Sequence, residues 1–264
     1  MSQKPNFGIV ALALAVSPFA ASQAATLQLD AIQRYDTART DSADLTATGT
    51  TDWAVWEVRR ATSANFAPTT SKTSGTAIGN VTNIGGTTMR GTSNAGNVAT
   101  GRYTWTGADA SSGVARTDYT LNGSLLFNDA ALTANTRENA GFSVSIQGGL
   151  TGVPNYLVLY LGGFLATGNL QVTLNGATTL LDTSVVFAAV NPKQTVAYQL
   201  IYTPDNANDV LTVNYPATGT SSTQNSHVGI EAISLGLTSV IPEPGSVLLG
   251  ALGATLLLGR RQRR

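Results

Sequence analysis

Aromatic side chains are the residues of this chain whose chemistry most readily suits a ligand. The three tryptophans, Trp53, Trp56 and Trp105, fall in two short segments, and Tyr103 lies beside the last of them. An aromatic ring can stack on the pyranose ring of a sugar, or it can anchor a hydrophobic core. Because successive side chains of a strand point to opposite faces, Trp53 and Trp56 cannot form one flat platform unless a bulge intervenes. Two interpretations stay open: one exposed ring that stacks on a sugar, or aromatic anchors of the core.

Oxygen-bearing side chains form two candidate calcium sites, because that ion prefers hard oxygen ligands. Glu231, in the last predicted strand, could join an N-terminal carboxylate, either Asp30 or Asp36. The second candidate is an oxygen-rich loop that contains Asp205, Asn206, Asn208 and Asp209. The residue spacing of a dedicated calcium-binding loop is absent, so an ordinary solvated turn is the alternative for this loop. Calcium would be a structural ion here, and no other cofactor is expected.

Residues for catalysis are sparse. His227 is the only histidine, and no serine in an elbow motif accompanies it, so we expect a polar residue at a strand edge rather than a catalytic triad. The chain has no cysteine, which excludes thiol catalysis and cysteine zinc sites. The acidic residues are too few to indicate the carboxylate-lined cleft of a glycoside hydrolase. A non-enzymatic protein is therefore predicted.

The charge distribution argues against a nucleic-acid partner. Residues 25–241 carry ten basic and fourteen acidic side chains, because Lys4, the four terminal arginines and Glu243 lie outside this range. The net charge of this part is therefore −4, which provides no basic surface for phosphates. Without cysteine no disulfide can stabilise the fold, so the burial of one large core must do so.

The elements that must position these residues are strands, and their pattern is clearest in the second half of the chain. Residues 156–161 form a continuous apolar run that Pro154 precedes, as expected of a strand covered on both faces. Residues 170–174 alternate apolar and polar side chains. Asn175-Gly176 then leads to residues 177–181, which predicts a hairpin with a type I′ turn.

A second hairpin is predicted to run from residues 196–202, through a loop at residues 204–209, to residues 210–215. The last predicted strand covers residues 228–235. The first half of the chain is less regular, and residues 61–97 indicate long loops with short strands around residues 78–84. The strand candidates of this half are residues 26–29, 51–58, 78–84, 99–106 and 118–127.

Composition and pattern together predict an all-β domain over residues 25–236. Thr and Val favour half-buried strands, whereas Gly and Asn supply turn conformations. No segment of this range shows a convincing helical period over ten or more residues. Many short strands separated by frequent turn signals indicate an antiparallel β-sandwich, jelly-roll-like in topology.

Several elements of this domain resemble a family of carbohydrate-binding modules. Their order runs from the segment 44–56, which contains Asp-Trp-x-x-Trp, through residues 103–107 to the strands at 141–146 and 156–163. It is similar to the galactose-binding type of module found in bacterial extracellular proteins, over most of residues 40–236. Only the Asp-Trp-x-x-Trp piece is specific, so the resemblance implies the fold more than the ligand.

Residues 1–24 have the pattern of a secretory signal peptide. Lys4 precedes an uncharged run from Phe7 to Ala21, and small residues at Ser22 and Ala24 suit signal peptidase. Cleavage is expected after Ala24. The alternative is an uncleaved N-terminal anchor, which the short apolar run and Pro18 disfavour.

Residues 237–264 combine a linker, an acidic break, an apolar run and a basic end. Pro242 and Pro244 withhold backbone donors, and Glu243 between them would be costly to bury in lipid, so a helix begins after them. Residues 245–259 carry no charge and reach about 22 Å as a helix, marginally short of the hydrocarbon core. A buried helix of a soluble domain, the alternative, would show polar residues on one face. The basic residues that predict a cytoplasmic end are Arg260, Arg261, Arg263 and Arg264.

This three-part order closely resembles the PEP-CTERM sorting signal of Gram-negative bacteria. The motif of that family matches Pro242-Glu243-Pro244, its membrane helix matches residues 245–259, and its arginine-rich end matches residues 260–264. The resemblance implies a substrate of an exosortase, a membrane enzyme that cuts near the motif and passes the protein to the cell surface or an exopolysaccharide matrix. A plain single-pass anchor is the alternative.

The sequence thus predicts an exported, non-catalytic surface or matrix protein with a structural or adhesive role. Its expected partners are signal peptidase, an exosortase-type enzyme, the inner membrane before processing and extracellular polysaccharide. Two further hypotheses stay open. A glycan-binding module would need an exposed tryptophan in a shallow groove, and a secreted hydrolase would need two carboxylates about 5–10 Å apart in a cleft.

Overall fold

The computed structural model describes residues 24–35, 42–85, 88–91, 101–121, 125–126, 139–175, 178–187, 194–218 and 226–237. Within these ranges the regular structure is β apart from one helix of four residues, α1 (Leu45–Thr48). The prediction of an all-β domain is therefore confirmed.

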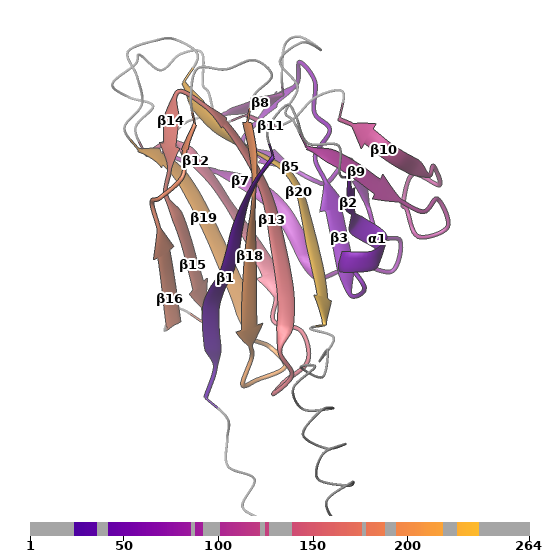
Figure 1. The fold of residues 1–264 in the computed structure, drawn as a ribbon, viewed down its shortest axis with the longest axis vertical. Coiled ribbons are helices and arrows are strands. Elements are labelled where there is room, and N and C mark those ends of the chain that lie inside the picture. Colours follow the sequence, from indigo (N-terminus) through magenta and orange to yellow (C-terminus); the bar gives the residue numbers. More distant parts are fainter. Residues whose placement is uncertain are drawn as a thin grey trace, which may run out of the picture.

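The strands form two large sheets and a small one (Figure 1). The larger sheet has the order β1 (Thr26–Tyr35), β18 (Gln194–Thr203), β13 (Asn155–Phe164), β20 (His227–Leu237), β11 (Leu125–Leu126), β8 (Met89–Gly91), β4 (Thr62–Ser63), with β3 (Asp52–Val55) beside β20 and β6 (Thr70–Ser71) beside β3. The second sheet has the order β16 (Thr178–Asp182), β15 (Leu170–Leu174), β19 (Val210–Thr218), β12 (Gly141–Gln147), β7 (Ile78–Ile84), β5 (Asn65–Phe66), with β14 (Ala166–Gly168) beside β19 and β17 (Val186–Phe187) beside β14. The small sheet has the order β10 (Arg116–Thr120), β9 (Arg102–Trp105), β2 (Ala43–Asp44).

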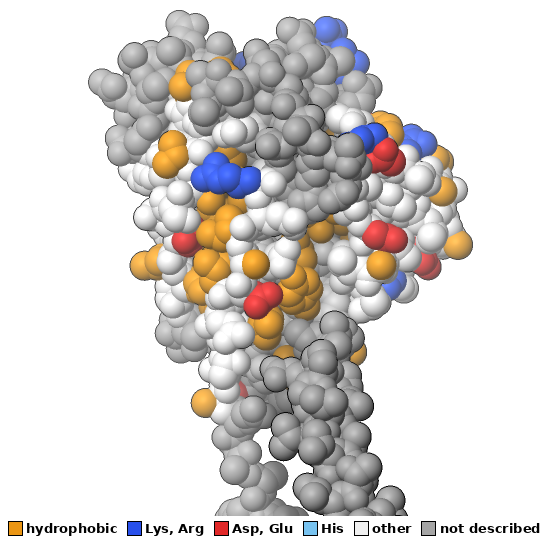
Figure 2. Space-filling view, viewed as in Figure 1, with side chains coloured by type: hydrophobic (Ala, Val, Ile, Leu, Met, Phe, Trp, Pro, Cys, Tyr) orange, Lys and Arg blue, Asp and Glu red, His pale blue; other side chains and the backbone are white. Residues whose placement is uncertain are grey.

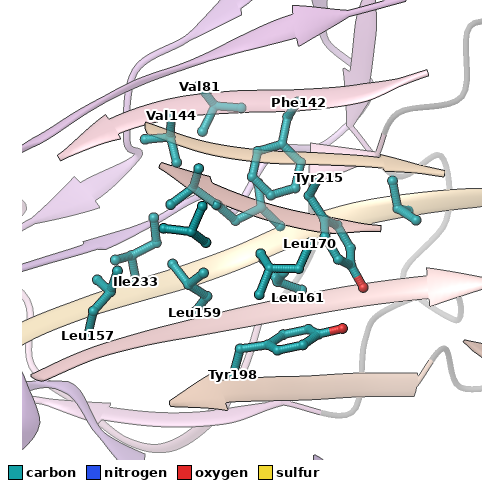
Figure 3. Packing of buried hydrophobic residues seen from close by; sticks show 14 of the residues in the cluster. Val81, Phe142, Val144, Leu157, Leu159, Leu161, Leu170, Tyr198, Tyr215 and Ile233 are labelled. Carbon is teal, nitrogen blue, oxygen red and sulfur yellow. The ribbon is translucent and has the colours of Figure 1, made fainter. Parts of the chain in front are cut away.

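The two large sheets face each other across the main core, as in a β-sandwich. Figure 3 shows Leu157 and Leu159 of β13 and Tyr198 of β18 on one side, and Phe142 of β12 and Tyr215 of β19 on the other. All five side chains are completely buried. They come from alternate positions of their strands, because a strand presents every second residue to the same face. Alternate side chains of these strands therefore form the main core.

One of the two predicted hairpins is confirmed. β15 and β16 pair antiparallel, with Leu174 opposite Thr178. Asn175, which follows β15, has a φ of 54°, in the left-handed region. Three residues separate the paired Leu174 and Thr178, whereas a type I′ hairpin turn has two, so the Asn-Gly signal placed the turn correctly but not its type.

The second predicted hairpin is wrong. β18 lies in the larger sheet between β1 and β13, whereas β19 lies in the second sheet between β15 and β12. The loop at residues 204–209 therefore carries the chain from one sheet to the other. A loop with turn residues shows that the chain changes direction, but it does not show which sheet the next strand joins.

Two other strands differ from their predicted extents. The strand predicted at residues 26–29 continues to Tyr35, with a bulge at Asp30, where Leu29 and Ala31 pair with consecutive residues of β18. The strand predicted at residues 118–127 is divided into β10 and β11, which belong to different sheets. The Asn122-Gly123 signal in between lies outside the described residues.

A third layer covers part of the outer face of the larger sheet. The small sheet and α1 pack there over a second core, formed by Ala43, Leu45, Trp53, Val55, Tyr103, Trp105, Ala110, Leu121, Val158, Tyr160, Ala197 and Ala232. Figure 1 shows this layer to the right of the large sheets. In Figure 2 the charged side chains of the visible face gather mainly over the same layer, whereas the area over β1, β18 and β13 carries few charges. The domain is therefore a sandwich with an added layer.

Candidate functional site

The aromatic residues that were candidates for sugar stacking are all buried. The exposed fractions of Trp53, Trp56 and Tyr103 are 0%, and that of Trp105 is 4%. In the second core the ring centroids of Trp53 and Trp105 lie 5.8 Å apart, and Tyr103 meets Tyr160 edge-on at 5.4 Å. None of these rings is exposed for stacking, because Trp53, Tyr103 and Trp105 pack in the second core and Trp56 packs in the main core. The rings are anchors of the core, the second of the two interpretations.

The two tryptophans of the Asp-Trp-x-x-Trp segment point to opposite sides of the larger sheet. Trp53 belongs to the second core, whereas Trp56 belongs to the main core. The indole nitrogen of Trp56 donates a hydrogen bond of 3.3 Å to the carbonyl oxygen of Phe66. The prediction that these two rings cannot form one platform is confirmed, and each of them instead secures a different layer.

β20 contains a bulge at Glu231. Ile230 pairs with Leu161 of β13, whereas Ala232 pairs with Tyr160, so Glu231 is the extra residue of β20. A bulge changes the face to which the following residues point. Ile230 accordingly belongs to the main core and Ala232 to the second core. Glu231, next to Ile230, points to the side of the second core, and the bulge places Ala232 on that side as well before Ile233 returns to the main core.

The carboxylate of Glu231 is held by hydroxyl groups in a buried polar cluster. Glu231 is 1% exposed; its Oε2 accepts a 2.7 Å hydrogen bond from the Tyr103 hydroxyl, and its Oε1 accepts one of 2.7 Å from the Thr195 hydroxyl. The cluster also depends on two glycines, since a Cβ at Gly101 would lie 2.3 Å from Oε2 and one at Gly162 would lie 2.9 Å from Oε1. A buried carboxylate needs such donors, because burial without them is costly. The cluster thereby joins β20, β18 and the small sheet.

The calcium site expected at Glu231 is not assembled by the described residues. Asp30 is exposed on β1, which β18 and β13 separate from β20, and Asp36 lies outside the described ranges. Across the part of the chain that the structure describes, no three His, Cys, Asp or Glu side chains gather to hold a metal ion. The oxygen atoms of Glu231 are instead used by neighbouring hydroxyls.

The oxygen-rich loop at residues 204–209 is organised around Asp209. This side chain is 3% exposed, and its Oδ2 accepts hydrogen bonds from the amides of Asp205 at 2.9 Å and Asn206 at 3.1 Å. Although burial acts to raise the pKa of Asp209, these donors and Asn175 lower it below the usual value. The carboxylate therefore closes a turn, in agreement with the alternative to a calcium site.

Asp52 is a buried carboxylate that the sequence pattern did not indicate as a site residue. Its Oδ1 accepts from the amide of Trp53 at 2.8 Å, and its Oδ2 accepts from those of Ala77 at 2.8 Å and Ile78 at 2.9 Å. Burial raises the pKa of Asp52, and these amides and Lys72 partly oppose the shift. Asp52 thus ties β3 of the larger sheet to the start of β7 in the second sheet. Its place in the Asp-Trp-x-x-Trp segment was the available signal, but its partners lie 25 and 26 residues away.

His227 was expected at the polar edge of a strand, but it lies in the interior of the protein. It is 2% exposed, and its ring stacks on Phe164 of β13 with centroids 6.1 Å apart. The expectation was wrong because β20 is an interior strand, flanked by β13 on one side and by β11 and β3 on the other. A residue at the end of such a strand is covered by its neighbours.

The predicted export signals lie almost entirely outside the described residues. Ala24, the predicted cleavage position, is described and exposed two residues before β1, so a cut there would leave the strand whole. The residues of the motif and the basic end, Pro242, Glu243, Pro244, Arg260, Arg261, Arg263 and Arg264, are not described. Among the helices that are described, none is long and apolar enough to cross a membrane.

The fold and the site define a layered all-β protein in which buried carboxylates connect the layers. No family model, curated protein or solved structure matches the chain. Its function is therefore argued from its own residues.

Proposed function

We propose that this protein is an exported bacterial surface or matrix protein, sorted through its C-terminal tail and non-catalytic in role. The observation that carries the proposal is the order of features after β20: a Pro-Glu-Pro motif, an uncharged run at residues 245–259 and an arginine-rich end. Together with a leader that ends at Ala24, this order suits a domain that is moved across a membrane and displayed.

The domain between these signals supports a structural role. Asp52 joins the two large sheets, and Glu231 joins the larger sheet to the small one. Both carboxylates are nearly completely buried and engaged by donors, so their chemistry is used to hold layers together. A cysteine-free protein that must persist outside the cell has to obtain its stability from such packing.

The topology is proposed to be jelly-roll-like. Successive long strands alternate between the two large sheets: β12 is in the second sheet and β13 in the larger one, and β18 is in the larger sheet and β19 in the second one. Crossings of this kind are typical of double-sheet jelly rolls. The glycan-binding alternative lacks an exposed tryptophan, since all three tryptophans are buried, and no other observation favours it.

The sorting mechanism is tested by replacing Pro242-Glu243-Pro244 with three alanines in the producing bacterium. We expect the altered protein to stay uncut and in the membrane fraction, because the processing enzyme would lose its recognition motif. A matched control replaces Thr238-Ser239-Val240, which has equal length and ends one residue before the motif, with alanines and should be processed like the parent. Intact mass and cell fractionation measure both outcomes. If the first variant matched the parent in mature mass and location, exosortase sorting would be excluded.

A further inference from the structure

The first and the last strand of the domain have their outer ends in the same row of paired residues, which crosses the larger sheet. Leu27 at the start of β1 pairs with Tyr202 of β18, Tyr202 pairs with Asn155 of β13, and Asn155 pairs with Leu237 at the end of β20. Three strand spacings separate Leu27 from Leu237, about 14 Å. The leader and the sorting tail are therefore attached at the same end of the sandwich, the lower end in Figure 1.

The chain between this row and the sorting motif is short. Leu237 is the last residue of a strand that neighbours hold on both sides, and Pro242 begins the motif five residues later. Five residues span at most about 18 Å, even when the chain is fully extended. While the tail is in the membrane, the lower end of the sandwich consequently cannot move far from the lipid surface.

The loops at this end form an ordered and weakly charged surface. The amide of Gly152 donates to the carbonyl oxygen of Pro204 at 2.8 Å, and the amide of Gly148 donates to that of Asp209 at 2.6 Å, so the loops at residues 148–154 and 204–209 are joined. Neither loop contains Lys or Arg. The side chain of Asp209 is turned into its own loop, where backbone amides hold it.

Most groups that this surface presents outward are uncharged. The exception is Asp205, which is half-buried and whose Oδ1 accepts a 2.7 Å hydrogen bond from the side-chain amide of Asn206. Leu150 is 58% exposed and Leu237 is 45% exposed, and they belong to the few large apolar side chains that are exposed in the described part of the molecule. Thr151, Asn206 and Asn208 are exposed beside them. Apolar and uncharged polar side chains suit the interface of a zwitterionic bilayer, because they can be placed among the headgroups without burying a charge.

We infer that this end of the sandwich, with its loops at residues 148–154 and 204–209, rests on the lipid surface as long as the tail is attached. The opposite end, where β1 and β13 end and β18 and β20 begin, then faces away from the membrane. This inference rests on the proposed function, since it needs the tail to be a membrane segment. It adds which surface meets the membrane and in which orientation the protein is presented to the processing enzyme.

Single-cysteine labelling tests the orientation, because the native chain contains no cysteine. One variant is Thr151→Cys, in the lower loop. Its matched control is Thr62→Cys, also an exposed threonine, at the other end. Thr62 belongs to a second row of paired residues, which crosses the larger sheet through Arg90, Leu126, Gly229 and Gly162. Gly162 lies seven residues along β13 from Asn155 of the lower row, so the two rows are about 23 Å apart along the strands.

Each full chain is produced in a host without the processing enzyme, labelled with a fluorescent maleimide and reconstituted into phosphatidylcholine–phosphatidylethanolamine vesicles. A fraction of the lipid carries a nitroxide on its headgroup, which quenches nearby fluorophores. We expect quenching at Thr151→Cys to exceed that at Thr62→Cys at least about threefold. The reason is that Thr62 should lie farther from the lipid surface by about seven residues of a strand, or about 23 Å. Vesicles without nitroxide correct for differences in brightness.

Equal quenching at the two positions, or stronger quenching at Thr62→Cys, would overturn the orientation while the protein still floats with the vesicles. If the labelled chains do not float with the vesicles at all, the tail is not a membrane segment. The proposed function then fails, and the inference fails with it. The two failures are therefore distinguished by flotation alone.

Discussion

The main core and the second core of this protein are built in different ways. The main core is largely aliphatic and comes from alternate residues of long strands such as β13, β15 and β19. The second core is rich in aromatic rings from short segments, and a polar cluster around Glu231 borders it. The main core depends on the volume of its side chains and on their alternation along the strands, which many sequences can satisfy. The second core depends also on hydrogen bonds between particular donors and acceptors.

The largest expected effect comes from a cavity in the main core. Leu159→Ala removes a completely buried side chain between the two large sheets, and we expect it to lower the free energy of unfolding by about 2–5 kcal/mol. Urea unfolding followed by tryptophan fluorescence measures the change. The matched control is Leu181→Ala on β16, whose side chain is 67% exposed, and it should cost no more than about 0.5 kcal/mol. Similar losses in both variants would contradict the assignment of the main core.

A smaller effect should come from the polar cluster beside the second core. Glu231→Gln keeps the shape of the side chain but removes the charge that accepts from Tyr103 and Thr195, and we expect a loss of about 2 kcal/mol. Tyr103→Phe removes one donor. A double-mutant cycle should give a coupling of about 1 kcal/mol between these two changes, measured by urea unfolding. Strictly additive losses would show that the hydrogen bond contributes nothing to stability.

The smallest effect should be a pH dependence at Asp52, which joins the two large sheets. Its pKa is raised in the folded protein above 3.8, mainly by burial. The folded state therefore holds the proton more tightly than the unfolded state, so the stability that this carboxyl contributes is complete at low pH. It declines as the pH rises through the folded pKa.

The comparison with Asp52→Asn isolates this contribution, because all other titrating groups are shared. The difference in unfolding free energy between the parent and the variant should narrow as the pH rises from about 3 to about 7. Urea unfolding at a series of pH values measures it. A difference that stays constant over this range would refute the raised pKa.

Individual strands could be predicted from the sequence far better than their partners. The extent of β7 agrees with its prediction, and the hairpin of β15 and β16 was recognised from Asn175-Gly176. The loop before β19 carries equally clear turn signals, yet β18 and β19 join different sheets. A turn signal reports backbone conformation at a few residues, whereas the sheet that a strand joins depends on which hydrophobic faces meet.

The candidate site was predictable only in part for the same reason. Trp53 and Trp56 were expected on opposite faces, and they are, because alternation is a property of the strand itself. Burial in a core was one of two open interpretations, and the sequence could not choose between them, because the layer that covers Trp53 includes β9 and β10, about 50 residues or more along the chain. The bulge at Glu231 leaves a signal, because the alternation of Val228 and Ile230 shifts by one residue at Ile233 and Leu235, but that pattern does not specify Tyr103 and Thr195 as donors to the carboxylate.

By itself the sequence determined that this protein is a β-structure of alternating strands, with segments before and after it that predict export. Those properties follow from side-chain periodicity, backbone propensity and local composition, which act over a few residues. Only the tertiary structure decided that a third layer packs over Trp53, that Tyr103 and Glu231 meet across 128 residues, and that both ends leave at one end of the sandwich. Such contacts are formed when distant surfaces exclude water together, and no local pattern specifies which surfaces those are.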